Sequence, residues 1–137
     1  MGTPATIDTE QLHALVPLAA TLRLRVVDAS PDAVGVELDH RPELCTAGGV
    51  LHGGALMTLA DTAGALCAYL NLPDGAAGTT TVESKTNLLA AVRDGTVTAI
   101  ATPLHVGSSL IVVETELRRD DGRLAAKTTQ TQAVLRG

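Results

Sequence analysis

A histidine, two glycines and a single acid stand out in this chain as residues that could take part in a chemical reaction. His52, Gly53 and Gly54 open an apolar run in which Asp61 is the only charged residue. If a helix begins here, its first N–H groups lack internal partners and carry partial positive charge, and glycines leave them accessible to an oxyanion. An aspartate can act as a general base on water or as a nucleophile on an acyl carbon. The run therefore combines two parts of an acyl-transfer site.

The same residues also have plain structural interpretations. The glycine pair can simply permit a tight passage from loop to helix, and a hydroxyl of Thr58 or Thr62, at helical spacing from Asp61, can satisfy the carboxylate. Buried acids without a partner are rare, so a functional role for Asp61 has at least equal support.

Two other kinds of site are weaker interpretations. Cys45, His52 and Asp61 could form a nucleophilic triad, but a helix would hold His52 and Asp61 too far apart, and nothing nearby in the sequence activates the thiol. The four histidines lack ligand spacing, so no metal site is expected.

Composition limits the class of protein. The 137 residues are 45% hydrophobic and 18% charged, which suits one soluble domain with its own core, spanning 1–137. A net charge of −5, dispersed cations and a single aromatic residue argue against a nucleic-acid partner. The apolar run is shorter than the ~20 residues of a membrane span and contains an acid. Two cysteines without CxxC spacing, and no signal peptide, favour a cytoplasmic location.

Hydrophobic periodicity and turn residues predict an α+β domain. Residues 1–8 are a loose start, followed by a helix over 10–20 whose regularity Pro17 limits. A loop is expected over 40–51 and a long helix over 53–71. Strands are predicted over 22–26, 34–39, 79–89, 96–104, 110–118 and 124–135, with hairpin turns at 30–33, 93–95 and 120–122. An antiparallel sheet with one helix lying across it follows.

The spacing of Gly53 and Asp61 predicts a shared site. Eight residues of helix separate them by about 12 Å along the axis. A donor and a base that act together must both lie ~3 Å from one reacting group. Within one chain the Asp61 side chain cannot cover that gap. Two copies are needed, and we expect a homodimer with two symmetric composite sites.

The motif resembles a known family. Gly49-x-x-His52-Gly53-Gly54, followed by the run 59–64 (Leu-Ala-Asp-Thr-Ala-Gly), is similar to the hotdog-fold acyl-CoA thioesterases, and most to their PaaI-type (phenylacetate-pathway-like) branch. The likeness covers about residues 15–135. It implies a hotdog fold, with an antiparallel sheet of about six strands wrapped around one long central helix. It also implies hydrolysis of aryl- or medium-chain acyl-CoA without a metal or organic cofactor, in homodimers that pair into tetramers.

The resemblance also implies roles for individual residues. The start of the helix, formed by His52, Gly53 and Gly54, is called the mouth below. The Gly53 N–H would polarise the thioester carbonyl, and His52 would fix the mouth or the substrate. Asp61 of the partner chain would be the base or the nucleophile. Thr81 would orient the water. Substrate contacts are expected from Thr46, Gly54, Val82, Glu83, Gly107, Ser108 and Ser109, and an aliphatic acyl pocket from Leu56, Met57 and Leu59. For Glu83, an exposed strand acid is the plainer interpretation.

Two departures from the family pattern concern binding rather than chemistry. Thr46 stands where the family often has asparagine, and Ser108 where it often has a basic residue. The coenzyme A phosphates are then left to other cations, for which the candidates are Arg118, Arg119, Arg123 and Lys127. A hotdog protein that binds acyl-CoA without turnover remains an alternative, and an enoyl-CoA hydratase-like enzyme ranks below it.

Overall fold

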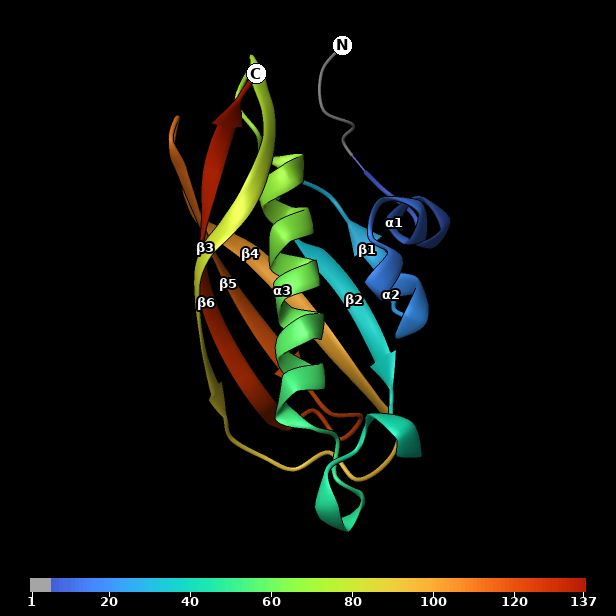
Figure 1. Cartoon of the computed structure of the whole chain (residues 1–137). Coiled ribbons are helices and arrows are strands. Elements are labelled where there is room, and N and C mark those ends of the chain that lie inside the picture. Colours follow the sequence, from blue (N-terminus) through green and yellow to red (C-terminus); the bar gives the residue numbers. More distant parts are fainter. Residues whose placement is uncertain (1–5) are drawn as a thin grey trace.

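The computed structural model describes residues 6–137 and shows one curved antiparallel sheet holding a long helix (Figure 1). Six strands lie in the order β1-β2-β4-β5-β6-β3. This is the arrangement that the family resemblance implies. The helices are α1 (Thr9–Leu15), α2 (Pro17–Thr21) and α3 (Gly53–Leu70), with 3-10 turns at Pro42–Leu44 and Ala47–Gly49. The strands are β1 (Arg25–Ala29), β2 (Val34–Asp39), β3 (Ala76–Leu88), β4 (Thr96–Val106), β5 (Leu110–Arg118) and β6 (Leu124–Arg136).

The central helix α3 forms where the apolar run predicts it. His52 caps its first turn, and Asn71 ends it. One side packs into the sheet through small and branched residues, and Leu59, Ala63 and Cys67 are fully buried there. The chain leaves the opposite side partly open along a stripe at helical spacing, formed by Gly54, Met57, Thr58, Asp61, Ala65 and Tyr69. A helix so apolar with an uncovered stripe presents a surface for another group to cover.

The inner face of the sheet is mostly apolar, and most of its fully buried polar residues lie on β6. Residues of β4 and β5 that point toward α3, such as Val97, Ala99 and Ile111, are fully buried. On β6 the equivalent positions in the middle of the strand are polar and equally buried: Thr128, Gln130 and Gln132. Buried amides need hydrogen-bond partners, so this segment of β6 marks a polar interior beside the helix.

The N-terminal predictions need correction. The predicted helix 10–20 is two helices, since Pro17 has no N–H and starts α2 after a break at Val16. Asp8 caps α1 through a capping box with Gln11. The predicted strand 22–26 begins later, at Arg25, because the chain turns at Arg23, whose φ is +56°. Of the predicted loose start, residues 1–5 lie outside the described residues.

The predicted hairpin turn at 93–95 is also wrong. Gly95 does adopt the left-handed conformation of a tight turn, with φ +71°. The strands on either side nevertheless do not pair, because β3 pairs with β6 and β4 pairs with β2 and β5. The connection passes next to the residues that lead into α3, where the Leu51 N–H donates to the Val92 carbonyl at 2.9 Å. No helix in the described part of the chain is long and apolar enough to cross a membrane.

Candidate active site

Asp61, half-buried in the middle of α3, is held by the sheet. Its Oδ1 accepts a hydrogen bond from Thr81 Oγ1 at 2.9 Å and another from Gln130 Nε2 at 3.1 Å. Thr58 and Thr62 do not contact the carboxylate, because their hydroxyls donate to backbone carbonyls one turn back along α3. The simple helical partners considered from the sequence are therefore excluded, and strands β3 and β6 position the acid.

Two further hydrogen bonds support the Thr81 hydroxyl, which donates to Asp61 because a carboxylate oxygen accepts. Gln132 Nε2 donates to Thr81 Oγ1 at 2.5 Å, and Thr79 Oγ1 can donate to Gln132 Oε1 at 3.1 Å. A hydroxyl has one proton, so Thr81 accepts from Gln132 and donates to Asp61. Both bonds to the acid end on Oδ1, and Oδ2 makes no hydrogen bond within residues 6–137. Asp61 thus has one anchored oxygen and one open oxygen.

Asp61 lines an apolar pocket of about 330 Å³ between α1 and α3. Its other lining residues are mostly aliphatic and come from both helices and from β3: Leu12, Leu15, Val16, Thr62, Ala65, Leu66, Tyr69 and Thr79. The expected lining residues lie elsewhere, since Leu56 and Leu59 are buried in the core and Met57 is 42% exposed. None of the three lines the pocket at Asp61, although Leu56 lines the hollow beside Gly53.

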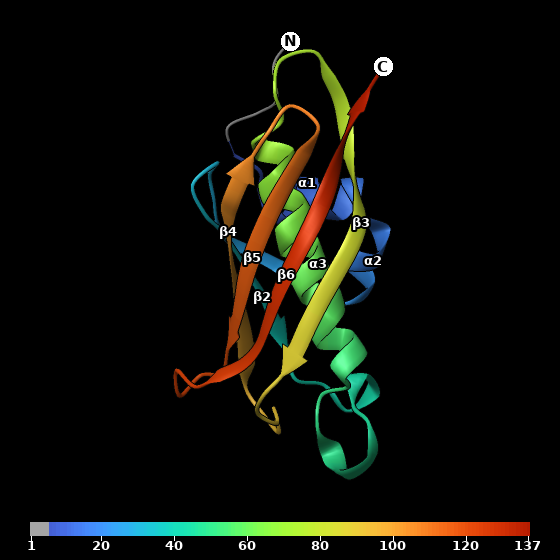
Figure 2. The same cartoon turned by 90° about the vertical axis from the view of Figure 1, so that its left-hand side faces the viewer.

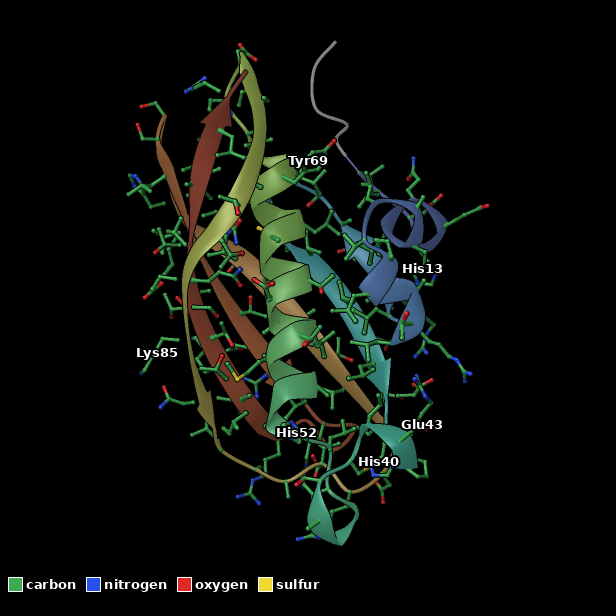
Figure 3. The ribbon with its side chains drawn as sticks, in the orientation of Figure 1. His13, His40, Glu43, His52, Tyr69 and Lys85 are labelled. Atoms are coloured by element: carbon green, nitrogen blue, oxygen red, sulfur yellow. The ribbon has the colours of Figure 1, made fainter. Side chains whose placement is uncertain are left out.

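The mouth of α3 leaves one amide free. His52 Nδ1 accepts the Gly54 N–H at 2.8 Å, and the His52 carbonyl accepts the Ala55 N–H at 2.9 Å. The Gly53 N–H has no acceptor in the described chain, so it is the amide open to a ligand. A neutral His52 ring that accepts at Nδ1 carries its proton on Nε2. Figure 3 shows His52 at one end of α3 and Tyr69 at the other.

Glycine is required at the second position of the helix. A Cβ on Gly54 would lie 2.9 Å from His52 Nδ1, so a side chain there would displace the capping ring. A Cβ on Gly53 would lie 2.6 Å from Leu88 Cδ1, the end of an exposed and movable side chain. Gly54 therefore serves the cap, and its N–H is already used by His52.

The mouth and the acid belong to different hollows. Gly53 lines a pocket of about 290 Å³ together with Leu56 and residues 88–92, and Asp61 is not among its lining residues. The pocket at Asp61 in turn does not include His52 or Gly53. Within one chain the structure does not bring the two predicted parts of the chemistry together.

Several predicted substrate contacts do not line the pocket at Asp61 within one chain. Glu83 accepts a hydrogen bond from Thr131 at 3.2 Å, and Thr131 points to the face of the sheet opposite Gln130 and Gln132. The loop of Gly107, Ser108 and Ser109 lies at the C-terminal end of α3, far from the mouth (Figure 2).

Two others lie nearer the mouth or the acid. Val82, next to Thr81, is the extra residue of a β-bulge on the edge strand β3 and is 57% exposed. Thr46 is exposed on the loop that leads to His52.

The structure also shows the surroundings of the cysteines and of the cations considered for coenzyme A. Cys45 Sγ lies 3.2 Å from His40 Nε2, and no hydrogen bond in the described chain links Cys45 to His52 or His52 to Asp61, so the Cys45–His52–Asp61 triad is not assembled. Burial raises the pKa of the Cys67 thiol to about 11.

Of the four cations considered for coenzyme A, Arg118, Arg119 and Lys127 form ion pairs with neighbouring acids, and Arg123 forms none within the described chain.

The sequence analysis assigns no role to Gln130, Gln132 or Gly64, although Gly64 ends the motif at 59–64. A signal was present, because alternation along β6 places both glutamines on the face of Ala126 and Thr128, which is the inner face. Two amides at inward positions of a strand indicate a buried polar network. Which helical residue they contact could not be read from the sequence.

An exposed helix amide and an anchored carboxylate beside an apolar pocket are the parts of a hydrolase that acts on acyl groups. Residues 48–126 match the family model of the thioesterase superfamily. The chain belongs to this superfamily and is a thioester hydrolase. Its assignment to the PaaI-type branch stays a prediction.

Relatives and solved structures agree with this membership. A candidate esterase from Saccharolobus solfataricus is 36% identical over 84% of this chain and 81% of its own. The 1,4-dihydroxy-2-naphthoyl-CoA hydrolase of Escherichia coli is 34% identical over 64% of this chain and 63% of that enzyme. The crystal structure of a Haemophilus influenzae thioesterase superposes with a TM-score of 0.87, at 28% identity over 96% of this chain and 92% of that one. The hotdog fold predicted from the motif is therefore confirmed.

Proposed function

We propose that the chain hydrolyses acyl-CoA thioesters with aryl or medium-chain acyl groups to the free acid and coenzyme A. The observation that carries this proposal is the state of Asp61, with Oδ1 held by Thr81 and Gln130 and Oδ2 open at an apolar pocket. The similarity to a CoA-thioester hydrolase of E. coli supports coenzyme A as the thiol.

The proposed chemistry uses water, a carboxylate and a backbone amide. As a base, Asp61 takes a proton from water while the water oxygen attacks the thioester carbon. As a nucleophile, Asp61 attacks that carbon itself, and water then hydrolyses the anhydride. In either case the Gly53 N–H and the α3 dipole hold the developing oxyanion. The C–S bond breaks, and the coenzyme A sulfur leaves as a thiolate or takes a proton. No metal or organic cofactor is needed.

We propose a homodimer in which Gly53 of one chain faces Asp61 of the other. Three features support it: the two groups line different pockets, the α3 stripe is uncovered, and β3 is an edge strand with an exposed Val82. An unpaired edge of this length is suited to pairing with a second copy. Pairing of dimers into tetramers, and a cytoplasmic location, complete the proposal.

The lining of the pocket at Asp61 indicates which class of acyl group the site accepts. Its walls are aliphatic apart from Tyr69 and hydroxyls, and the described residues place no cation there to receive a charged acyl group. Apolar acyl groups are favoured because they lose unfavourable contact with water when they enter. Octanoyl- and phenylacetyl-CoA are representative substrates of this class.

A thiol-release screen tests the proposal. Acetyl-, octanoyl-, phenylacetyl- and succinyl-CoA are compared, and the octanoyl and phenylacetyl thioesters are expected to react with the highest kcat/KM. Ala65→Phe, which fills the pocket, should lower hydrolysis of octanoyl-CoA much more than that of acetyl-CoA. Ala14→Phe on the exposed side of α1 is the matched control and should change neither. No thiol release from any thioester would overturn the proposal.

A further inference from the structure

Gln130 is a fully buried amide with an uneven set of partners. Its Nε2 donates to Asp61 Oδ1 at 3.1 Å, while its Oε1 is buried without any hydrogen-bond partner in the described chain. A buried carbonyl without a partner is unfavourable, so its presence in the core requires a reason. Turning the amide over would set the carbonyl oxygen against the carboxylate, which is worse. The orientation that leaves Oε1 unsatisfied is the one that serves Asp61.

Gly64 makes this orientation possible. A Cβ at this position would lie 2.0 Å from Gln130 Oε1 and 2.5 Å from Cδ. Gly64 is one turn from Asp61 on α3, in a helix interior where glycine is disfavoured relative to alanine. Both the orphaned carbonyl and the helical glycine oppose stability, and both are explained by one amide aimed at the acid.

Gln132 acts on the same oxygen through Thr81. Its donation to Thr81 Oγ1 occupies an acceptor lone pair of the hydroxyl and directs the Thr81 proton to Asp61 Oδ1. Gln130 and Gln132 are two residues apart on β6 and point to the same face. Two buried amides from one strand thus converge, one directly and one through a hydroxyl, on a single carboxylate oxygen.

We infer that Gln130 and Gln132 are positioning residues for the thioesterase reaction. They anchor Oδ1 so that Asp61 presents only Oδ2 to water or to the thioester carbon. The inference rests on the proposed function, because it assigns these residues an effect on Asp61 as base or nucleophile. It also gives Thr81 a different role from the one the resemblance implies, since its proton is directed to the acid rather than to the water.

Gln130→Met tests the inference. Methionine fills a similar volume without the orphaned carbonyl, so the thermal midpoint should equal or exceed that of the wild type. With octanoyl-CoA, kcat should fall between about tenfold and a hundredfold, because a carboxylate held by one donor instead of two loses its alignment. KM should not change. Loss of activity without loss of stability is a result that a purely structural role for Gln130 does not produce.

Thr115→Val is the matched control. Thr115 is also fully buried on the inner face with an unpartnered hydroxyl, but it has no link to Asp61. Its replacement should leave kcat and KM at wild-type values and should not lower the thermal midpoint. A similar fall in kcat in this control would show that any change in the polar interior impairs the reaction, and the inference would be wrong.

Gly64→Ala provides a second variant that keeps every polar group. Its Cβ displaces the Gln130 amide, so kcat should fall with KM unchanged, and combining it with Gln130→Met should cause no further loss. Wild-type kcat in both folded single variants would overturn the inference. If Gln130→Met does not fold, wild-type kcat in Gly64→Ala alone overturns it. Failure of the proposed function is distinguishable, because then the wild type itself releases no thiol.

Discussion

The two chemically active parts of α3 are built in different ways. At its mouth, His52 and Gly53 offer a free amide through local backbone geometry, on residues adjacent in sequence. At its middle, Asp61 is held by side chains from β3 and β6, up to 69 residues away. The mouth has partial positive charge and no acid, whereas the middle has an acid and no free N–H. Each part lacks what the other has, which is why the reaction needs both, from two chains.

Removing the acid should have the largest effect. Asp61→Asn keeps one oxygen to accept from Thr81 and Gln130 and replaces Oδ2 with an amide, so the fold and oligomeric state should remain intact. Turnover should fall at least about a hundredfold because the base or nucleophile is lost. Asp32→Asn, the same change at an exposed acid between β1 and β2, is the control and should leave kcat unchanged. Near-normal hydrolysis of the acyl-CoA panel by Asp61→Asn would remove Asp61 from the chemistry.

Removing the free amide tests the mouth. Gly53→Pro deletes the N–H at the first helical position, where proline is well tolerated, and His52 already has the extended ψ of 136° that a following proline requires. Loss of one oxyanion donor should lower kcat about a hundredfold. Gly53→Ala keeps the N–H and should cost much less, because Leu88 is exposed and can move. Equal activity of the proline and alanine variants would exclude the Gly53 amide as a donor.

Removing the Thr81 hydroxyl beside the acid should lower kcat less than removing the acid itself. Thr81→Val keeps the shape of the side chain and removes its donation to Asp61, so kcat should fall on the order of tenfold. Thr81→Ser restores the hydroxyl and should recover most of the activity. Steady-state kinetics with octanoyl-CoA measures both variants. A valine variant with wild-type kcat would show that Gln130 alone is sufficient to hold the carboxylate.

The smallest effect is expected on stability at the mouth. His52→Ala removes the side-chain acceptor of the Gly54 N–H and should lower the free energy of unfolding by about 1 kcal/mol, the usual value of a helix N-cap. His52→Asn offers another capping oxygen and should recover most of it. Urea denaturation measures both. An alanine variant as stable as the wild type would show that the observed His52–Gly54 bond does not stabilise the helix.

Sequence predicted these two parts of α3 unequally. The mouth can be predicted because a histidine, two glycines and an apolar run are local signals in the sequence. The predicted helix 53–71 agrees with α3 to within one residue. Asp61 also stands out in the sequence, but helical spacing offers only neighbours on its own helix, Thr58 and Thr62, as structural partners. Gln130 donates to Asp61 and Gln132 donates to Thr81 because β6 lies beside β3, and the sequence does not determine that these two strands pair. The incorrect hairpin at 93–95 has the same cause.

The most direct test of the two-chain site is a mixing experiment. Asp61→Asn and Gly53→Pro proteins, each nearly inactive, are combined under conditions in which native mass spectrometry shows exchange of subunits. Half of the randomly formed dimers are mixed, and each has one intact site that combines Asp61 of one chain with Gly53 of the other. We expect thiol release from octanoyl-CoA to recover to roughly a quarter of the wild-type rate. A mixture with confirmed exchange that is no more active than its components would contradict the shared site.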